Sequence, residues 1–227
     1  MGADLSSAIR NGRALMAGAA PAGGPPGAVQ VWIEEVREGD DALVAHEVRP
    51  YRDLLQLRRP LPAPPSGLDT RAFDPARDMD EFITVNNRAF AWHPEQAGLS
   101  RERAMATMDE AWFDADGFRI LERDGRIAGF CWTKVHHNTV PVLGEIYVIA
   151  VDPDFHGRGL GSELTLAGLD HLTSLGIDTA MLYVDASNEA AVAMYRRLGF
   201  EVHSTNAAFV TDVTGRPGPV PNRVGAR

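Results

Sequence analysis

The stretch that decides the fold is VDPDFHGRGLG, which runs from Val151 to Gly161. The segment before it, Glu145 to Val151, is almost wholly apolar and has the composition of a buried strand. The segment after it, Ser162 to Leu175, repeats leucine at three-residue steps along one side, as an amphipathic helix does. The pattern therefore predicts a strand, a glycine-rich turn and a helix N-terminus in direct succession.

A turn of this kind is suited to hold a phosphate group. Backbone N–H groups at a helix start point outward, and the helix dipole adds roughly half a positive charge there. Glycines allow the backbone to approach a phosphate because they have no Cβ. A nucleotide P-loop would end in Gly-Lys-Ser/Thr, but this turn ends at Gly161 and Ser162 without the lysine. A dinucleotide fingerprint, Gly-x-Gly-x-x-Gly/Ala, would need glycine or alanine at position 162, where Ser162 stands.

Composition narrows the class of partner. The chain has 227 residues, of which 44% are hydrophobic and 23% charged, so it can bury a core. Its net charge is -9 and its sequence pI is about 5.2. Nucleic acids and anionic membranes need a basic surface, and both are therefore disfavoured as partners. A small cationic substrate such as an amine suits an acidic chain better.

Cysteine and histidine usage argues against a metal site or a disulfide. Cys131 is the single cysteine, and its apolar neighbours favour a core residue over a nucleophile. His136 and His137 are the only adjacent pair among seven histidines, no third ligand is evident, and we interpret these histidines as loop residues. No apolar stretch approaches the roughly 20 residues of a membrane helix, and no signal peptide is evident. We expect a cytoplasmic, monomeric protein.

The chain divides into two structured parts joined by a proline-rich linker. The first part should contain strands at Val29–Ile33 and Leu54–Leu57 and a helix at Ala42–Val48, after a short helix within residues 7–20. The expected segments are a flexible N-terminus at 1–27, a partial domain at 28–62, a linker at 63–68, a main domain at 69–211 and a disordered tail at 212–227.

The main domain alternates helices and strands in an order typical of a mixed sheet. We predict helices at 80–90, 101–112, 162–175 and 189–198, strands at 117–122, 127–135, 145–151 and 179–184, and a closing hairpin within 201–210. Asp124 and Gly125 should form a hairpin turn, and Gly199 should cap the last helix. The prediction is an α/β (α+β) fold with a mixed central sheet flanked by helices.

The spacing of the turn resembles the acetyl-CoA signature of the GNAT family, Gln/Arg-x-x-Gly-x-Gly/Ala. His156 stands in the place of the usual Gln or Arg, and it can still offer a hydrogen bond. The preceding Val151-Asp152-Pro153 and a second block at 188–200 also resemble this family. The resemblance implies a GNAT fold and acetyl-CoA as cosubstrate.

Several shorter stretches are similar to the mycothiol synthase family, whose members consist of two tandem GNAT domains. These stretches lie at 85–90, 93–96, 132–136, 144–148 and 182–185, within a resemblance that covers residues 68–210. The family acetylates the cysteinyl amine of cysteinyl-glucosaminyl-inositol. Residues 12–16 and 28–62 resemble parts of the first tandem domain, so we expect a remnant of that domain whose front is absent, either because the chain begins late or because it is a truncated paralogue.

The resemblance also implies roles for individual residues. Glu145 would be the general base, through water, and Tyr195 the acid that protonates the departing thiolate; the alternatives are a solvated carboxylate and a core tyrosine. Glu95, Lys134, Glu145 and Tyr183 would contact the substrate, and the alternatives are an ordinary loop carboxylate, a solvated lysine and a strand tyrosine. The residues expected to bind the cofactor are Ile149, Ala150, Val151, His156, Gly157, Arg158, Gly159, Leu160, Gly161, Ser162, Asn188, Glu189, Ala190, Ala191, Val192 and Ala193. A bulge near Ile149–Val151 would free an N–H group for the acetyl carbonyl.

Two other functions stay open on these residues. One is a GNAT enzyme that acts on a protein N-terminus, a polyamine or another small amine. The other is an acyl-CoA-binding module without catalytic activity. Ser162 has no Gly-x-Ser-x-Gly context, so hydrolase chemistry is disfavoured.

Overall fold

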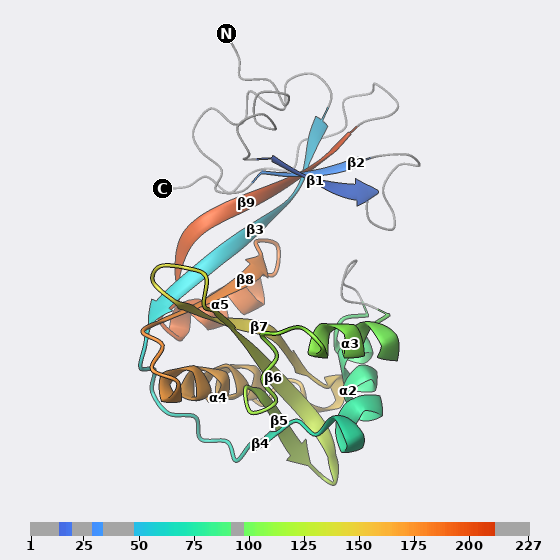
Figure 1. The fold of residues 1–227 in the computed structure, drawn as a ribbon, viewed down its shortest axis with the longest axis vertical. Coiled ribbons are helices and arrows are strands. Elements are labelled where there is room, and N and C mark those ends of the chain that lie inside the picture. The colour runs from blue at the N-terminus through green and yellow to red at the C-terminus, as the bar shows by residue number, and fades with distance from the viewer. Residues whose placement is uncertain (1–13, 20–28, 34–47, 92–97, 212–227) are drawn as a thin grey trace. The chain divides into compact units, whose positions relative to one another are not determined.

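The computed structural model describes residues 14–19, 29–33, 48–91 and 98–211, and the chain forms two compact units (Figure 1). The larger unit comprises residues 57–183 and 193–201. The smaller unit comprises residues 1–56, 184–192 and 202–227. Each unit has its own sheet segment.

The sheet of the larger unit is mixed. Its strands lie in the order β8-β7-β6-β5-β4. Neighbours from β4 to β7 are antiparallel, and β7 and β8 are parallel. The bounds are β4 Arg71–Ala72, β5 Phe118–Arg123, β6 Arg126–His136, β7 Leu143–Val151 and β8 Thr179–Asp185. Asp124 and Gly125 have φ values of 54° and 75°, which confirms the predicted hairpin turn between β5 and β6.

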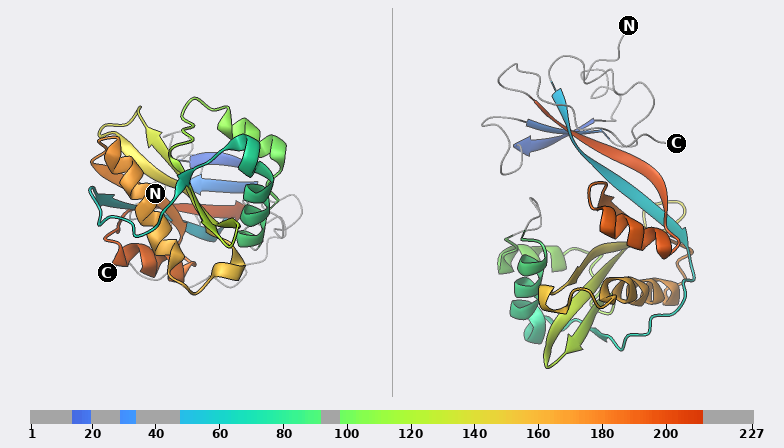
Figure 2. Two further views of the ribbon diagram at one scale, coloured as in Figure 1. Left: turned by 90° about the horizontal axis from the view of Figure 1, so that it is seen from below. Right: turned by 180° about the vertical axis from the view of Figure 1, so that it is seen from behind.

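Helices cover both faces of this sheet (Figure 2). Phe130 and Trp132 of β6 contact Phe82 of α2 (Pro75–Ala89), whereas Cys131 lies beneath Gly168 of α4 (Leu160–Ser174). Successive strand residues point to opposite faces, so α2 and α4 lie on opposite sides of the sheet. The short helix α3 (Arg101–Met108) packs beside α2.

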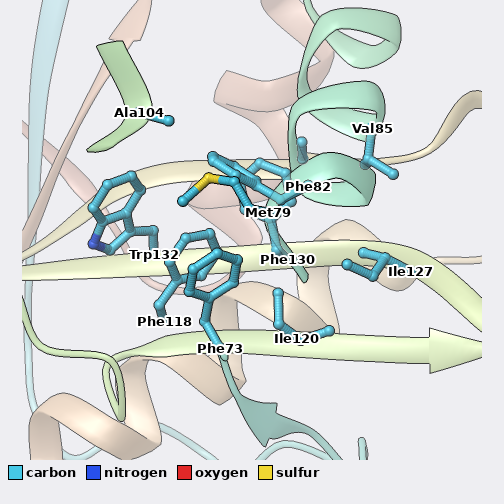
Figure 3. Packing of buried hydrophobic residues seen from close by; sticks show 11 residues of the cluster. Phe73, Met79, Phe82, Val85, Ala104, Phe118, Ile120, Ile127, Phe130 and Trp132 are labelled. Carbon is cyan, nitrogen blue, oxygen red and sulfur yellow. The ribbon is translucent and has the colours of Figure 1, made fainter. Parts of the chain in front are cut away.

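The core on the α2 side is aromatic (Figure 3). Phe118 stacks between Phe73 at 4.4 Å and Trp132 at 4.7 Å, measured between ring centroids. Phe82 meets Phe118 edge-on at 5.1 Å. Offset and edge-to-face contacts of this kind add to the stabilisation from burial. The cluster fixes α2 on β5 and β6 and so holds that face of the sheet rigid.

The capping residues, more than the apolar pattern, determine where the helices begin. α2 begins at Pro75, five residues before the predicted start, because the Asp74 side chain accepts a hydrogen bond from the N–H of Ala76. α3 begins at Arg101 as predicted, with Ser100 as its cap, but it ends at Met108 and not at Trp112. α4 and α5 (Glu189–Arg197) match their predicted ranges within two residues, and Gly199 after α5 has φ 82°.

In the smaller unit the strand order is β1-β2-β9-β3, and two predictions there were wrong. Residues of the expected helix at 7–20 form strand β1 (Ala14–Ala19), because pairing with β2 (Val29–Ile33) overrides the helix propensity of alanine and leucine. β9 (Glu201–Thr211) is one strand and not a hairpin, since no glycine or proline interrupts it.

Of the remaining predictions for the smaller unit, some are confirmed and others lie outside the described residues. β2 matches its predicted range, and the strand predicted at Leu54–Leu57 is part of the longer β3 (Val48–Pro60). The helix predicted at Ala42–Val48 lies outside the described residues except for Val48, which belongs to β3. The tail at 212–227 also lies outside them. No helix in the described ranges is long and apolar enough to span a membrane.

Candidate active site

The glycine turn has the conformation that its sequence predicts. A 3-10 turn, η2 (Pro153–Phe155), leads into Gly157 and Gly159, whose φ values are 75° and 74°. Gly159 is the N-cap of α4 and supplies no side-chain cap. The N–H groups of Ser162 and Glu163 donate to the Gly159 carbonyl. Within the described part of the chain, no acceptor is recorded for the N–H groups of Leu160 and Gly161, so they are available to a ligand.

Ion pairs hold the residues that precede this turn. Arg88 at the end of α2 lies 3.2 Å from the buried Asp152 carboxylate and 2.9 Å from that of Asp154. Arg126 lies 2.9 Å from the second Asp154 oxygen. Hydrogen bonds from Arg126 and Arg88 lower the pKa of Asp154. The entry to the turn is therefore fixed to both α2 and β6.

The imidazole of His156 is engaged by the protein itself. Its Nε2 lies 2.9 Å from the Val151 carbonyl oxygen. A carbonyl only accepts, so Nε2 carries the proton in this contact. The turn residues Gly157, Arg158 and Gly159 are exposed, and Leu160, Gly161 and Ser162 are partly buried at the helix start.

A β-bulge in β7 corrects the predicted alternation of side chains. Trp132 pairs with Val148 and Thr133 with Ile146, which leaves Tyr147 as the extra residue. The bulge therefore lies at Tyr147, before Ile149 and not within Ile149–Val151. Beyond Tyr147, each residue of β7 therefore lies on the face of the sheet opposite to the one that simple alternation predicts.

Simple alternation predicted that Glu145 shares a face with Ile149 and Val151. Because of the bulge, it lies on the opposite face from them. Ile149 pairs with Cys131 on the α4 side. Ala150 belongs to the aromatic core on the α2 side. Glu145 and Tyr147 also lie on the α2 side, Glu145 opposite Lys134 in the register.

The parallel strands β7 and β8 pair over only three residues. The pairs are Gly144 with Ala180, Glu145 with Met181 and Ile146 with Leu182. No pair is recorded for the described residues of β7 beyond Ile146, where the strand runs on to the glycine turn. Its backbone groups on that side are thus available to an extended ligand.

Glu145 is buried at the point where the two strands part. Its residue is 7% exposed, and its Oε2 lies 2.7 Å from Nε2 of His136. Met181 pairs with Glu145, so Tyr183, two residues further along β8, points to the same face. Tyr183 is 39% exposed.

Lys134 is directed toward aromatic rings and not toward Glu145. Its Nζ lies 4.4 Å from the ring centroid of Trp112 and 5.5 Å from that of Tyr147. The attraction of an ammonium group to a ring face stabilises this position. Burial and the nearby Glu145 raise the pKa of the Tyr147 phenol, so Tyr147 is neutral beside the lysine.

Tyr195 lies on α5 in the larger unit and is buried. Its ring meets Phe200 edge-on at 5.8 Å, and burial raises the pKa of its phenol above the usual range. The phenol therefore carries its proton at neutral pH. Next to it, the sulfur of Met194 lies 3.3 Å from the place where a Cβ on Gly161 would be, so α5 packs against the start of α4.

The predicted distal cofactor residues begin α5. Asn188 caps this helix: its Oδ1 accepts a hydrogen bond of 3.2 Å from the N–H of Ala191. Val192 is buried. Glu189, Ala190 and Ala193 are exposed. Glu95, the remaining predicted substrate contact, lies outside the described residues.

Sequence reasoning missed two side chains that the structure brings to the site. His136, interpreted as a loop residue, ends β6 and contacts Glu145. Trp112, predicted to end a helix, lies beneath Lys134. Alternation along β6 could have indicated His136, because it is two residues from Lys134 and shares its face. Trp112 follows an irregular turn, and no pattern in the sequence indicated its position.

The single cysteine lies in the core. Burial raises the pKa of Cys131 to about 12, and its side chain is 0% exposed, which confirms its interpretation as a core residue. Among the described residues, no three His, Cys, Asp or Glu side chains are grouped as metal ligands would be.

Known proteins with similar sequences cover much of the chain. It is 46% identical over 194 residues to the mycothiol acetyltransferase of Acidimicrobium ferrooxidans, covering 82% of this chain and 63% of the relative. It is 48% identical over 169 residues to the mycothiol acetyltransferase of Streptomyces coelicolor, covering 71% and 54%. The chain thus spans between about half and two thirds of the length of these relatives.

Solved structures with the same fold are more distant in sequence. A GCN5-related N-acetyltransferase from Sphaerobacter thermophilus matches with a TM-score of 0.66 at 23% identity, over 85% of this chain and 62% of that one. A tandem GNAT protein from the clavulanic acid biosynthesis pathway matches with a TM-score of 0.57 at 16% identity, over 85% and 65%. These likenesses support the fold alone.

The family model gives the more direct assignment. The model of the acetyltransferase (GNAT) family matches residues 86–200, about half of the chain. The match includes the bulged strand β7, the glycine turn and helix α5. It agrees with the mixed sheet, so the predicted fold class is confirmed. The chain belongs to the acetyltransferase (GNAT) family.

Proposed function

We propose that the chain is an acetyl-CoA-dependent N-acetyltransferase that acetylates the cysteinyl amine of cysteinyl-glucosaminyl-inositol and so forms mycothiol. The observation that carries this proposal is the parting of β7 from β8 after Ile146, with the glycine turn at the end of β7 and a buried carboxylate, Glu145, at its start. The relatives named mycothiol acetyltransferase support the acceptor.

The glycine turn suits the diphosphate of coenzyme A. The N–H groups at the start of α4 face outward, and the dipole of this 15-residue helix favours an anion there. The unpaired edge of β7 would bond the amides of the pantetheine arm, as an added strand does. The first residues of α5, Asn188 to Ala193, would line the far end of the cofactor.

The reaction joins an amine nitrogen to the acetyl carbon and breaks the carbon–sulfur bond. Glu145 would accept the proton of the attacking amine through a water molecule, since only a neutral amine is nucleophilic. A backbone N–H at the bulge in β7 would polarise the acetyl oxygen. Tyr195 would give its proton to the sulfur, which leaves as a thiol, and burial keeps this phenol protonated until then.

The acceptor would lie on the face that Glu145, Lys134 and Tyr183 share. Lys134 and Tyr183 can bond the hydroxyl groups of the sugar and inositol, while Glu145 and Glu95 attract the ammonium group. We assign this chemistry to residues 69–211. Residues 28–62 would then be the end of a first tandem domain.

Mass spectrometry of acceptor products tests the proposal. The purified 227-residue chain is incubated with acetyl-CoA and one acceptor at a time. The acceptors are cysteinyl-glucosaminyl-inositol, a peptide with a free N-terminus and a polyamine. We expect a gain of one acetyl group on the first acceptor at a rate at least about a hundredfold above the others. Faster acetylation of the peptide or the polyamine would refute the proposed acceptor and identify the faster one in its place. No transfer to any of them, with coenzyme A still bound, would indicate a binding module.

A further inference from the structure

The contact between His136 and Glu145 lies outside the roles described so far. Glu145 is buried, its side chain 9% exposed, and its Oε2 lies 2.7 Å from Nε2 of His136. The imidazole is itself partly buried, with 22% of its side chain exposed. A bond this short between a ring nitrogen and a carboxylate fixes the rotamers of both side chains.

The register places lysine and not histidine opposite Glu145, yet the histidine makes the contact. Lys134 stands directly opposite Glu145 across β6 and β7, the place from which a cross-strand ion pair would form. Its ammonium group lies instead over Trp112, and no ion pair between Lys134 and Glu145 is recorded in the described ranges. His136 reaches Glu145 along the diagonal, because it is two residues from Lys134.

This arrangement keeps the carboxylate available as a base. A pair with a full ammonium charge would hold the proton-accepting oxygens in a strong electrostatic bond. His136 meets the carboxylate through one ring nitrogen, Nε2, at Oε2, which leaves the second oxygen for a water molecule or the amine. In the described residues, the carboxylate of Glu145 has no hydrogen-bond partner recorded besides His136.

We propose that His136 is a positioning residue, which orients the Glu145 carboxylate so that its second oxygen meets the acceptor amine. This inference rests on the proposed function, since it assigns His136 to the same site. The charged and titratable groups around the pair are Lys134, Tyr147 and, near Tyr147, Arg103 and Glu110. None of these is recorded within ion-pair distance of Glu145.

The test is steady-state kinetics of the full chain with acetyl-CoA and the amine acceptor that the wild type acetylates. His136→Ala removes the donor and should lower kcat at least about tenfold, which corresponds to one hydrogen bond to a charged group. The KM for acetyl-CoA should stay within about twofold, because the glycine turn is untouched. His136→Gln keeps an N–H donor and should recover kcat to within about threefold of wild type.

Two controls separate positioning from a structural effect. His137→Ala changes the exposed neighbouring histidine and should leave kcat and the thermal midpoint unchanged. In a Glu145→Gln background, adding His136→Ala should change kcat by less than about twofold, because His136 acts only through the carboxylate.

Three results would overturn the inference. The first is a wild-type kcat in His136→Ala. The second is an equal loss in His136→Ala and His136→Gln with equally lowered midpoints, which would make the histidine structural. The third is a full additional loss in the Glu145→Gln background. A wild-type chain that acetylates no acceptor would refute the proposed function and this inference together, whereas an active wild type with an unaffected His136→Ala refutes this inference alone.

Discussion

Gly168 determines how closely α4, the helix that presents the glycine turn, approaches the sheet. A Cβ at this position would lie 2.5 Å from Sγ of Cys131, 2.8 Å from Cδ1 of Ile146 and 3.2 Å from Cγ2 of Thr133. Cys131 is 0% exposed, so its sulfur has no space into which to move. We therefore expect Gly168→Ala to lift α4 from β6 and β7.

Two opposing effects set the change that Gly168→Ala makes in the free energy of unfolding. Alanine in place of glycine inside a helix stabilises it by about 1 kcal/mol. Overpacking a close-packed core costs about 1–3 kcal/mol, and a contact at 2.5 Å belongs at the upper end. We expect Gly168→Ala to lower the free energy of unfolding by about 1–2 kcal/mol. Cys131→Ala removes the nearest atom, so the double variant should be more stable than additivity predicts by about 1 kcal/mol or more.

Urea unfolding of the wild type, both single variants and the double variant measures this coupling. The free energies of unfolding form a double-mutant cycle, and the slopes with urea check that the unfolded states are comparable. A cycle that closes within about 0.5 kcal/mol of additivity would refute the account of close packing at Gly168. So would a Gly168→Ala variant more stable than wild type.

Three further predictions concern Cys131, Lys134 and Tyr195. Burial raises the pKa of Cys131 from its usual 9.0 to about 12, so its contribution to stability is full below about pH 9 and is lost as pH rises toward 12. Between pH 8 and 9.5 the wild type should lose about 0.8 kcal/mol more than Cys131→Ala in chemical unfolding, and parallel curves would contradict this. Lys134 is the only lysine of the chain, so reductive ¹³C-methylation labels one side chain besides the N-terminus. Its methyl resonance should shift upfield over the ring of Trp112 and lose that shift in Trp112→Leu, and a wild-type resonance at the free-lysine position would exclude the contact. Tyr195→Phe should lower kcat about a hundredfold with unchanged coenzyme A affinity, and a wild-type kcat would leave Tyr195 as a core residue.

The elements around the glycine turn could be predicted because local physics fixes them. An apolar run, glycines that tolerate positive φ and a leucine-lined helix follow one another between Glu145 and Leu175, and each signal is read within a few residues. The structure has a strand, a turn with φ near 75° at Gly157 and Gly159, and a helix in that order. The roles of these residues stay predictions.

The wrong predictions concern residues whose structure depends on pairing with a strand that is distant in the sequence. Period-two alternation placed Ile149 on the face of Glu145, but the extra residue at Tyr147 reverses the faces beyond it. A bulge is visible only in the register with β6, and no residue type in β7 announces it. Residues 14–19 have good helix formers, yet β2 pairs with them as a strand.

Side-chain contacts were the least predictable part of the site. The register pairs Lys134 with Glu145 across β6 and β7, a position from which an ion pair could form. The position of Trp112, after an irregular turn, decides instead that the ammonium group lies over a ring. His136 then takes the place at the carboxylate.

The account depends most on coenzyme A binding at the turn before α4, and one titration tests it. Gly159 and Gly176 flank this helix with φ values of 74° and 75°, and a Cβ on either would meet no atom within 4 Å. An alanine at either position therefore carries the same backbone strain, of about 1 kcal/mol. In isothermal titration calorimetry with coenzyme A, the wild type and Gly176→Ala should bind equally, with a Kd of about 1–100 µM, and Gly159→Ala at least about tenfold more weakly. Equal binding by the two alanine variants, or no binding by the wild type, would contradict the assignment of the turn.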